Sequence, residues 1–470
     1  MRLRQDRWVW TLFVLLGAGL GLGVLHADAT AADPAVERAY TEAFELQRAR
    51  ATDAAVLKYQ EALSLDPDHV PSLYEIGWSY YVLSRWGDVV ASWERVLELQ
   101  PDHADAARHL PEARANLALV ERARLGTAVT LGPDAVAPKA GPSLRFALGG
   151  DTMMGSPLSR SGLPKDGGAS LFSAYADLMQ AADVAFLNLE GTLLDSGAST
   201  KCKDPESACY AFRTPVAYVK HLVAAGVDVV STANNHHNDF GEAGRASTLG
   251  ALNGAGVAWS GPVGHETILD VDGVKVGLLA FATSPGSNDL RRVDLAAVAV
   301  ADLAAKVDLV MVSFHGGSEG SSSQHVTPGK ETFHGEDRGD VQAFAHAVVD
   351  AGADLVVGHG PHVLRGMELY RDRLIAYSLG NFITYGGFNL TGPLGLTGLL
   401  VADLHPDGRF AGGRFVAGRQ VPPGGPILDP EGQAVAIVRA LSQGDFPDSA
   451  VQIADDGTIT GLPGVEADPQ

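Results

Sequence analysis

Five segments of this chain carry side chains of the kinds that bind divalent metal ions, each directly after an apolar run typical of a buried strand. One such residue would mean little, but five such segments together predict a metal site. Mixed carboxylate, amide and imidazole groups suit manganese, zinc, iron or similar divalent ions, whereas a soft thiolate site is disfavoured. The residues are Asp151, then Asn188 and Glu190, then Asn234, Asn235 and His236, then His315, then His359 and His362.

Six apolar strands alternating with helices, from Ser143 onward, must position these residues. The apolar runs are continuous, as in strands that are covered on both faces. Ligands of open α/β sheets bind beyond the carboxyl ends of the strands, so we expect the polar residues at one edge. Asp272-Gly273 predicts a hairpin turn, and the region of Asp372 a weaker one. Helices are expected over residues 171–182, 216–226, 242–255, 295–306 and 340–352.

Motifs in this part of the chain resemble those of the capsule-synthesis CapA family, which is related to poly-γ-glutamate production proteins. The resemblance covers about residues 145–420. It implies an α/β fold of the calcineurin-like metallophosphoesterase type, a β-sandwich flanked by helices. The motifs are GGDTMMG (149–155), NLEGTL (188–193), NNHHNDFG (234–241), HGGSEG (315–320), GADLVVGHGPHV (352–363) and YSLGNF (377–382).

The resemblance implies a role in metal binding for six of these residues. Asp151 looks like the first metal carboxylate, and Glu190 resembles a carboxylate that bridges two ions. Asn235 looks like an amide ligand of the second ion. The remaining three resemble imidazole ligands, and they are His315, His359 and His362.

The resemblance also implies which residues act on a substrate. His236 would be the general acid or would stabilise developing charge, beside Glu190. Asn381 would orient the edge of the site. Arg213 could bind an anionic substrate group, with a plain surface arginine as the equal alternative. Met153 stands where ordinary metallophosphoesterases have a histidine, so one ligand is lost and the site is expected to hold one or two divalent ions.

Two loops carry further candidate side chains. Cys202 and Cys209, the only cysteines, predict a local disulfide in an oxidising compartment, with two free thiols as the alternative. A polar loop after HGGSEG could be a lid over the site or a solvated surface loop. This loop carries His325, His334, Glu336, Asp337 and Arg338.

The N-terminus has the order of an export signal: basic residues up to Arg7, an apolar run over residues 8–25, then small residues. The apolar run has 18 residues, close to the roughly 20 that span a bilayer, so a retained membrane anchor is the alternative. In both cases the rest of the chain lies outside the cytoplasm. We expect it in the periplasm, at the cell surface or anchored to the outer face of the inner membrane.

A helical repeat is expected between this segment and the α/β domain. LDPDH recurs as LQPDH, with Pro67 and Pro101 34 residues apart, which resembles the tetratricopeptide family. Such segments bind protein partners, with a mere spacer as the alternative. The expected divisions are a signal or anchor over 1–31, the repeat over 35–124, a linker over 125–142, the CapA-like domain over 143–423 and a C-terminal extension over 424–470. The extension should hold one helix and a strand pair around Asp456-Gly457.

The formal charge of −21 disfavours nucleic acid as a partner, because like charges repel. The first functional hypothesis is a metal-dependent hydrolase or transferase that acts on an envelope polymer or phospho-intermediate in capsule or poly-γ-glutamate synthesis. The second is a non-catalytic assembly and export factor with a structural metal and a partner-binding repeat. A third, a plain repeat scaffold, leaves the polar strand ends without an explanation.

Overall fold

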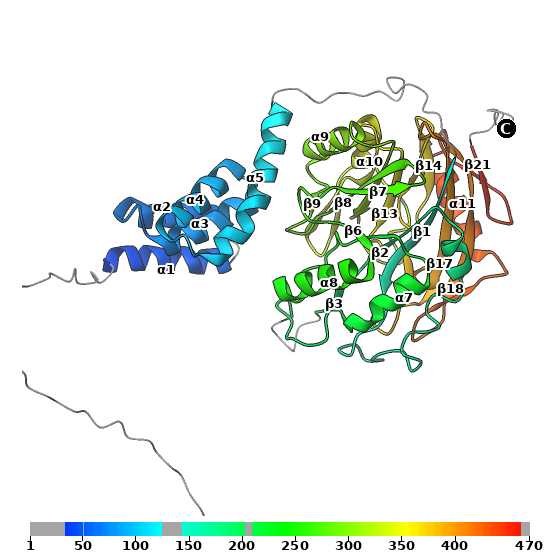
Figure 1. Ribbon diagram of the computed structural model, residues 1–470, viewed down its shortest axis with the longest axis horizontal. Helices are drawn as coiled ribbons and strands as arrows, with labels where there is room; N and C mark the ends of the chain where they lie inside the picture. Colours follow the sequence, from blue (N-terminus) through cyan, green and yellow to red (C-terminus); the bar gives the residue numbers. More distant parts are fainter. Residues whose placement is uncertain (1–32, 50, 125–142, 203–208, 462–470) are drawn as a thin grey trace, which may run out of the picture. The chain divides into compact units, whose positions relative to one another are not determined.

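The structure is a computed structural model that describes residues 33–49, 51–124, 143–202 and 209–461 (Figure 1). The chain divides into two units, Met1–Ser79 and Tyr80–Gln470. The expected export signal or anchor, the linker over 125–142 and the last residues of the chain lie outside the described residues. Within the described ranges, no helix combines the length and the apolar character needed to cross a membrane.

Helices fill the described chain before residue 125, as predicted. In the first unit α1 contacts α2, and the Tyr59 hydroxyl donates to Gln47 Oε1 over 2.7 Å. Ala43, Ala55 and Tyr59 are fully buried, as expected for paired helices that approach closely. The assignment to tetratricopeptide repeats stays a prediction. The helices are α1 (Pro34–Arg48), α2 (Thr52–Leu65), α3 (Val70–Val82), α4 (Trp86–Leu99) and α5 (Ala104–Arg124).

The first of two large β-sheets has the strand order β20-β21-β18-β17-β1-β2-β5-β6, with β16 beside β1 and β19 beside β18. Strands β1, β2, β5 and β6 run parallel, so their carboxyl ends share one edge. Asp151 of β1 is in register with Asn188 of β2 and Asn381 of β16. The strands are β1 (Leu144–Met153), β2 (Val184–Leu189), β5 (Val229–Ser231), β6 (Ala258–Ser260), β16 (Asn381–Thr384), β17 (Leu396–Leu404), β18 (Phe410–Gln420), β19 (Pro426–Leu428), β20 (Gln452–Ile453) and β21 (Thr458–Thr460).

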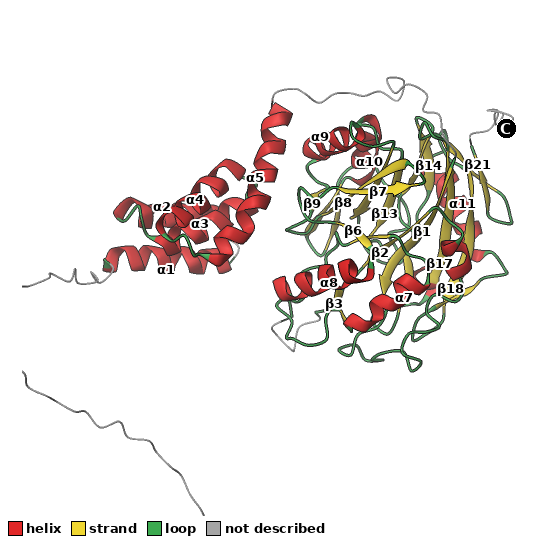
Figure 2. Ribbon diagram, viewed as in Figure 1, coloured by secondary structure: helices red, strands yellow, loops and turns green. Residues whose placement is uncertain are grey.

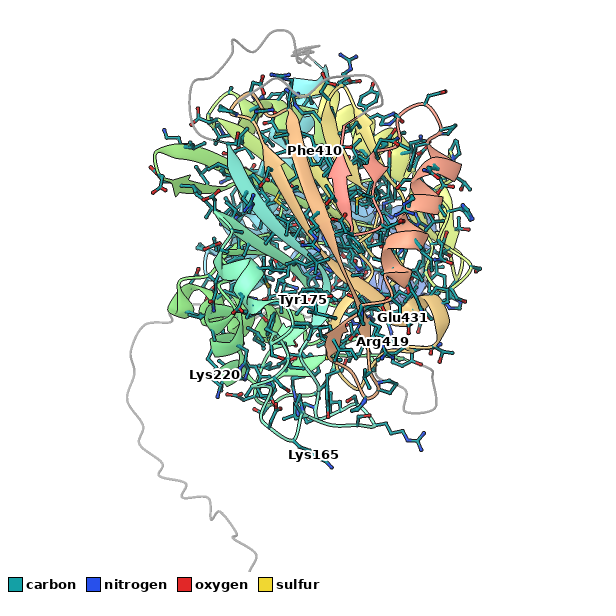
Figure 3. The ribbon with its side chains drawn as sticks, turned by 90° about the vertical axis from the view of Figure 1, so that its right-hand side faces the viewer. Lys165, Tyr175, Lys220, Phe410, Arg419 and Glu431 are labelled. Atoms are coloured by element: carbon teal, nitrogen blue, oxygen red, sulfur yellow. A yellow bond between two sulfur atoms is a disulfide. The ribbon has the colours of Figure 1, made fainter. Side chains whose placement is uncertain are left out.

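The residues after 423 contribute directly to this first sheet. Strands β19 and β21 both pair with β18, and β20 pairs with β21 around the expected Asp456-Gly457 turn. Helix α11 (Gln433–Asp445) lies beside β18, which Figure 3 shows running from Phe410 towards Arg419. The segment predicted as a C-terminal extension therefore includes strands of the same sheet.

The second sheet has the order β14-β15-β13-β10-β8-β7, with β9 beside β8. Strands β8, β10, β13 and β15 are parallel, and His315 at the end of β10 is in register with His359 at the end of β13. The predicted hairpin joins β7 to β8, where Asp272 and Gly273 have φ values of 50° and 87°. The strands are β7 (Thr267–Val271), β8 (Val274–Ala282), β9 (Asn288–Asp289), β10 (Leu309–His315), β13 (Leu355–His359), β14 (Met367–Tyr370) and β15 (Arg373–Ala376).

The two sheets pack face to face around one apolar core, to which Phe186 of the first sheet and Met311 of the second both belong. Two further clusters lie between the sheets and the outer helices. Figure 2 shows α9 and α10 on one side of the strands and α7 and α8 on the other. The predicted helix-flanked sandwich is therefore what the chain forms. The helices are α6 (Ala176–Gln180), α7 (Val219–Ala224), α8 (Gly241–Ala255), α9 (Val293–Ala304) and α10 (Val341–Asp350).

Some expected elements are shorter than the sequence pattern indicated, among them the helix over 216–226, of which α7 covers Val219–Ala224. The helix expected over 171–182 is reduced to α6, because the residues before it form turns that end at the buried Tyr175. The Tyr175 hydroxyl donates to the backbone oxygen of Val416 in β18 (3.3 Å), and Figure 3 labels this residue against the sheet. Strand β5 ends at Ser231, because the chain then turns into the loop that carries Asn234 and His236.

Candidate metal centre

Glycines directly before two of the ligand-type residues allow the backbone to approach closely at the sheet edge. Gly150 precedes Asp151, and a Cβ added there would lie 2.1 Å from the Gly380 oxygen. Gly358 precedes His359, and a Cβ there would lie 2.1 Å from a carbonyl oxygen of the facing segment. Any side chain would force these segments apart. The small residues thus bring the carboxylate and the imidazole into the same region.

Asp151 is fully buried and has partners on both carboxylate oxygens. Asn188 Nδ2 donates to its Oδ1 over 2.7 Å, and His362 Nδ1 pairs with its Oδ2 at 3.0 Å. Its own backbone N–H donates to the Gly380 oxygen over 2.8 Å. Burial opposes ionisation of this group, but the hydrogen bond with His362 and the nearby imidazoles hold its pKa below the ordinary value. Asp151 therefore offers a fixed, negatively charged group.

Glu190 follows β2 and lies among three imidazoles. Its Oε1 is 3.3 Å from His315 Nε2, 3.8 Å from His362 Nε2 and 4.0 Å from His236 Nε2. Burial and the nearby Asp151 carboxylate raise the pKa of Glu190 well above its ordinary value. Asp151, Glu190 and His315 each offer a ligand atom within 4.8 Å of the others, so they form a buried group that could hold a metal ion.

The remaining imidazoles lie beside this group. His359 Nδ1 is 3.7 Å from Asp151 Oδ1, and burial lowers the pKa of His359 to about 4. Burial also lowers the pKa of His315 well below its usual range. Burial acts in the same direction on His362, but Glu190 and Asp151 raise the pKa of that imidazole to about 10. His315 and His359 are therefore neutral at pH 7, the form in which histidine binds metal.

The unpartnered atoms of the cluster fit a divalent cation. Buried polar groups in proteins are nearly always hydrogen-bonded, since an unpaired one costs free energy. In the described chain, both carboxylate oxygens of Glu190, His315 Nε2 and both ring nitrogens of His359 are buried without a hydrogen-bond partner. The Asn235 side-chain oxygen is buried without a partner in the same way. A cation that accepts oxygen and imidazole ligands would satisfy this set.

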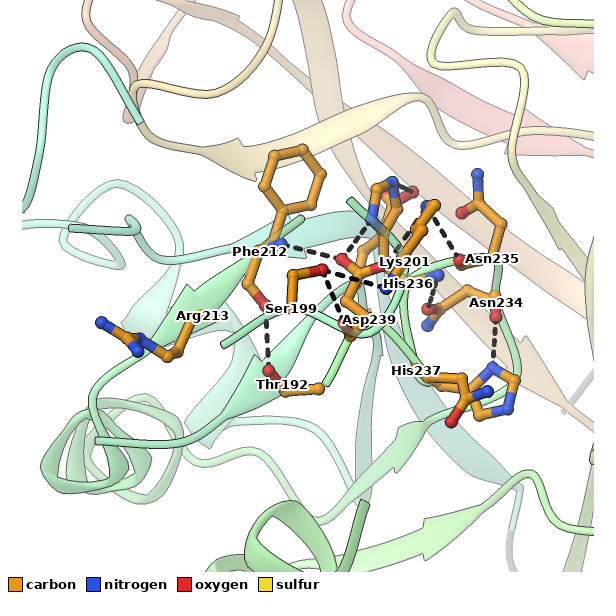
Figure 4. A network of polar contacts seen from close by, with 12 residues as sticks. Thr192, Ser199, Lys201, Phe212, Arg213, Asn234, Asn235, His236, His237 and Asp239 are labelled. Carbon is orange, nitrogen blue, oxygen red and sulfur yellow. Dashed lines mark hydrogen bonds and ion pairs between the residues drawn. The ribbon is translucent and has the colours of Figure 1, made fainter. Parts of the chain in front are cut away.

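His236 is held by Asp239 (Figure 4), and its other ring nitrogen is directed at Glu190. His236 Nδ1 lies 2.7 Å from Asp239 Oδ2, which also accepts the Phe212 N–H over 2.8 Å. Lys201 Nζ lies 3.1 Å from Asp239 Oδ1. Because Asp239 acts as an acceptor, the His236 proton sits on Nδ1 and the neutral ring presents the Nε2 lone pair towards Glu190. Burial lowers the pKa of His236, and Asp239 partly opposes the shift.

Asn234 secures the loop that carries His236. Its Nδ2 donates to Asn188 Oδ1 over 3.1 Å and to the Leu189 oxygen over 2.9 Å. Its Oδ1 accepts the His236 backbone N–H over 3.1 Å. Asn234 is thus occupied by the protein itself, whereas its neighbour Asn235 keeps a free side-chain oxygen.

Of the two expected substrate-binding residues, the structure places Asn381 beside the cluster and Arg213 away from it. Asn381 is fully buried next to Asp151 in register, and its Nδ2 donates to the Leu394 oxygen over 3.1 Å. Arg213 Nη1 donates to the Gly197 oxygen over 2.7 Å, and Figure 4 shows its guanidinium pointing away from His236. The structure therefore does not bring Arg213 to the cluster, and its contact with an anionic substrate stays a prediction.

Other expected features of the site region also have definite positions. Cys202 and Cys209 form the predicted disulfide. Met153 is buried, and its sulfur accepts the Gly155 N–H (3.2 Å). In the polar loop, His325 Nδ1 pairs with Asp445 Oδ1 of α11 over 2.7 Å. A lid role for this loop stays a prediction.

Sequence reasoning missed three residues at the site, namely Asp239, Lys201 and Glu319. Asp239 stands inside the NNHHNDFG motif three residues after His236, so the motif contained a signal for it. Glu319 also stands inside a motif, HGGSEG, but nothing in the sequence indicated that it lies 3.9 Å from His362.

Comparison with known proteins gives the family. The family model described as "Bacterial capsule synthesis protein PGA_cap" matches residues 145–385. Similar curated proteins include "Capsule biosynthesis protein CapA" of Bacillus anthracis, 34% identical over 37% of this chain and 44% of that protein. "PGA biosynthesis protein CapA" of Bacillus subtilis (strain 168) is 30% identical over 52% of this chain and 63% of that protein.

A "Probable polyglutamine synthesis accessory protein" of Mycobacterium tuberculosis is 34% identical over 43% of this chain and 56% of that protein. The chain thus spans about half the length of the curated relatives it matches. The family match takes in β1 to β16 and every residue of the buried cluster, and it covers more than half of the 470 residues. This chain belongs to the CapA family of bacterial capsule and poly-γ-glutamate synthesis proteins.

Proposed function

We propose that this chain is a metal-dependent hydrolase or transferase that acts on an envelope polymer or phospho-intermediate in capsule or poly-γ-glutamate synthesis. The observation that carries the proposal is the His236–Asp239 pair, with Nδ1 held at 2.7 Å and Nε2 directed at Glu190. The pair places an oriented, neutral imidazole beside the proposed ligands. Such a group is what acid–base catalysis requires.

The metal site would use residues of the buried cluster, four of which (Glu190, Asn235, His315 and His359) carry unpartnered ligand atoms in the described chain. Asp151 and Glu190 would supply carboxylate oxygens, and His315, His359 and His362 would supply ring nitrogens, with Asn235 as an amide donor. One or two ions of manganese, zinc or iron would suit this set. A bound divalent ion supplies Lewis acidity towards a phosphoryl or acyl oxygen and towards water.

The protein's own groups would handle the proton. His236, with its Nδ1 proton directed to Asp239, can accept a proton at Nε2 from the attacking nucleophile. The same nitrogen can return the proton to the leaving group. Asp239 stabilises the positively charged ring between the two transfers, as in other His–carboxylate pairs. Asn188 and Asn234 keep Asp151 and the His236 loop in place.

A second candidate function is a non-catalytic assembly and export factor with a structural metal. Two observations favour it. Met153 provides no ligand where ordinary metallophosphoesterases have a histidine, and one relative is named an accessory protein. In this alternative the helical segment over 35–124 would bind a protein partner, and the acid–base pair would be dispensable.

We also propose that the chain works outside the cytoplasm, in the periplasm, at the cell surface or anchored to the outer face of the inner membrane. The Cys202–Cys209 disulfide supports this, because such bonds persist in oxidising compartments. The basic and apolar N-terminal residues support export, whether the apolar run over 8–25 is cleaved or retained as an anchor.

The proposed activity is tested on the full-length chain loaded with Mn²⁺ or Zn²⁺, using phosphoesters and γ-glutamyl amides as substrates. His236→Asn should lower kcat by about 10²–10⁴-fold while leaving the metal content unchanged. His325→Asn is the matched control, because His325 also pairs with an aspartate at 2.7 Å but lies on a different loop. Hydrolysis that is absent from the wild type would favour the assembly-factor alternative, whereas hydrolysis unaffected by His236→Asn would show that His236 takes no part in proton transfer.

A further inference from the structure

A third carboxylate, Glu319, faces the cluster from the loop that follows β10. Its Oε2 lies 3.9 Å from His362 Nε2, on the ring edge opposite the Nδ1 that pairs with Asp151. Its Oε1 forms an ion pair with Arg338 Nη2 at 2.9 Å. The Glu319 side chain is only 14% exposed. One oxygen is therefore held by the protein, and the other is directed towards His362.

The backbone on both sides of Glu319 is fastened by hydrogen bonds. Ser318 donates its backbone N–H and its hydroxyl to Glu331 Oε2, both over 2.8 Å. Gly320 N–H donates to the Pro361 oxygen over 3.0 Å, which ties the loop directly to the segment that carries His362. Glu319 thus has little freedom to move relative to that histidine.

A buried ion pair between Arg365 and Glu331 supports this loop. Arg365 donates to Glu331 through Nη1 (2.9 Å) and Nη2 (2.7 Å), and both side chains are buried. Buried ion pairs add little net stability over apolar residues of similar size, because desolvation offsets their attraction. The geometric precision of a two-point contact is the better explanation for this pair. Because Ser318 donates to Glu331, the pair fixes the backbone one residue before Glu319.

The carboxylates around His362 suit a positive charge, which the imidazole supplies through its raised pKa and which a bound cation would supply instead. Asp151, Glu190 and Glu319 all place a carboxylate oxygen within 4 Å of this one imidazole. Carboxylates held this close repel one another unless a positive charge lies between them. Arg338 faces only the far oxygen of Glu319, and the Glu190 oxygens have no hydrogen-bond partner in the described chain. The three carboxylates therefore make the surroundings of His362 rich in oxygen ligands.

We propose that Glu319 is a further metal ligand, oriented by Arg338, on the His362 side of the cluster. The inference rests on the metal site of the proposed function but not on its catalytic step. It predicts that an ion on this side has more carboxylate character than one beside His315 and His359. Hard oxygen ligands of this kind favour Mn²⁺ over softer ions.

The test measures Mn²⁺ binding to the full-length chain by calorimetry and by metal content after dialysis. Glu319→Gln keeps the size of the side chain but removes its charge, and it should weaken Mn²⁺ binding by about tenfold or more. Glu336→Gln is the matched control, because Glu336 is exposed at the start of β12 (Glu336–Gly339), and it should bind Mn²⁺ like the wild type. Arg338→Met leaves the carboxylate but frees it, and should weaken binding to a smaller extent.

The visible spectrum of the Co²⁺-loaded chain reports on the ligands independently of activity. Glu319→Gln should change this spectrum, whereas Glu336→Gln should not. Mn²⁺ affinity within twofold of wild type together with an unchanged Co²⁺ spectrum in Glu319→Gln would overturn the inference. If that variant fails to fold, Glu319→Asp replaces it, with the same two readouts and the same criterion. A wild type that binds Mn²⁺ normally but hydrolyses none of the substrates would instead overturn only the proposed activity.

Discussion

Asn188 donates its side-chain amide to Asp151 over 2.7 Å, from register-paired positions on the neighbouring strands β2 and β1. The hydrogen bond occupies Oδ1 of Asp151 and fixes the rotation of the carboxylate, so that Oδ2 faces His362. Replacing residues that orient metal ligands in this way typically weakens metal affinity by about 10–100-fold.

Asn188→Ala should weaken Mn²⁺ binding by about 10–100-fold, because the Asp151 carboxylate is no longer oriented. It should also lower the free energy of unfolding by about 1–3 kcal/mol, because buried groups lose a hydrogen-bond partner. Calorimetry and urea denaturation measure the two effects. Asn389→Ala is the control, since Asn389 is exposed and bonds only locally to the Thr391 N–H. Equal Mn²⁺ affinity in the two variants would contradict the expectation.

Glu190→Gln should show separately how burial of the carboxylate affects the stability of the metal-free protein and how the carboxylate contributes to metal binding. Without metal, Glu190 is fully buried near Asp151 and has no hydrogen-bond partner in the described chain, so the neutral amide should leave the metal-free protein at least as stable. With metal, the variant should lose stabilisation by the ion, which reaches about 2.7 kcal/mol at 100 times Kd for a single site.

Thermal unfolding in EDTA and in excess Mn²⁺ measures both effects of Glu190→Gln. The wild type should gain Tm with Mn²⁺, and the variant should not. A Tm gain of equal size in both proteins would show that Glu190 is not a ligand. His325→Asn serves as the control, because its imidazole pairs with Asp445 away from the cluster.

The metal-site residues at strand ends could be predicted because each follows an apolar run that had to become a buried strand. Asp151, His315 and His359 illustrate this, since each lies where its strand ends or within two residues of that point. Glu319 and Asp239 could not be found in the same way. Their roles depend on contacts with His362 and His236, which follow from how loops fold back and not from periodicity. Arg213 failed to reach the cluster for the same reason, because β4 (Arg213–Thr214) directs it towards Gly197.

The buried Glu331–Arg365 pair should make the free energy of unfolding depend on pH in the acidic range. Burial opposes ionisation of Glu331, but the hydrogen bond from Arg365 lowers its pKa below the ordinary value. A carboxylate whose pKa is lower in the folded state adds stability above its unfolded pKa, and this is lost as pH falls through the folded pKa. Glu331→Gln should therefore lower the free energy of unfolding most near pH 7 and progressively less below about pH 4.

Urea denaturation of the wild type and Glu331→Gln between pH 7 and pH 3 measures the pH dependence of this pair. The difference in unfolding free energy should narrow towards acid. Glu336→Gln, which changes an exposed glutamate on the strand that pairs with the strand of Glu331, should show a small and nearly constant difference. A gap between wild type and Glu331→Gln that widens towards acid would reverse the sign and contradict the assignment.

The disulfide should stabilise the chain without affecting the metal site. Replacing Cys202 and Cys209 by alanine opens a short loop and should lower the unfolding free energy by about 2 kcal/mol. Lys201, next to the bond, contacts Asp239 but none of the proposed ligand side chains, so Mn²⁺ affinity should stay within about twofold of wild type. Urea denaturation and calorimetry provide the two measurements, and a large loss of affinity would show that the bond positions the site.

Asp239→Asn tests whether the pair with His236 serves proton transfer. Asp239 Oδ2 accepts from both His236 Nδ1 and the Phe212 N–H, which fixes the imidazole proton on Nδ1. An asparagine can keep its oxygen on the Phe212 N–H and turn its amide towards His236. An amide N–H cannot accept the Nδ1 proton, so the ring should move its proton to Nε2 and lose the lone pair that faces Glu190.

We expect Asp239→Asn to lower kcat by about 10⁴-fold, as the same change does in a serine-protease triad, while Mn²⁺ content stays at the wild-type level. Nitrogen NMR of the histidine rings should report the change of tautomer at His236, and His236→Asn identifies its signals. A merely structural Asp239 would lower stability without moving the tautomer. Full activity with the altered tautomer would instead show that His236 Nε2 takes no proton, and that the metal site works without an acid–base partner.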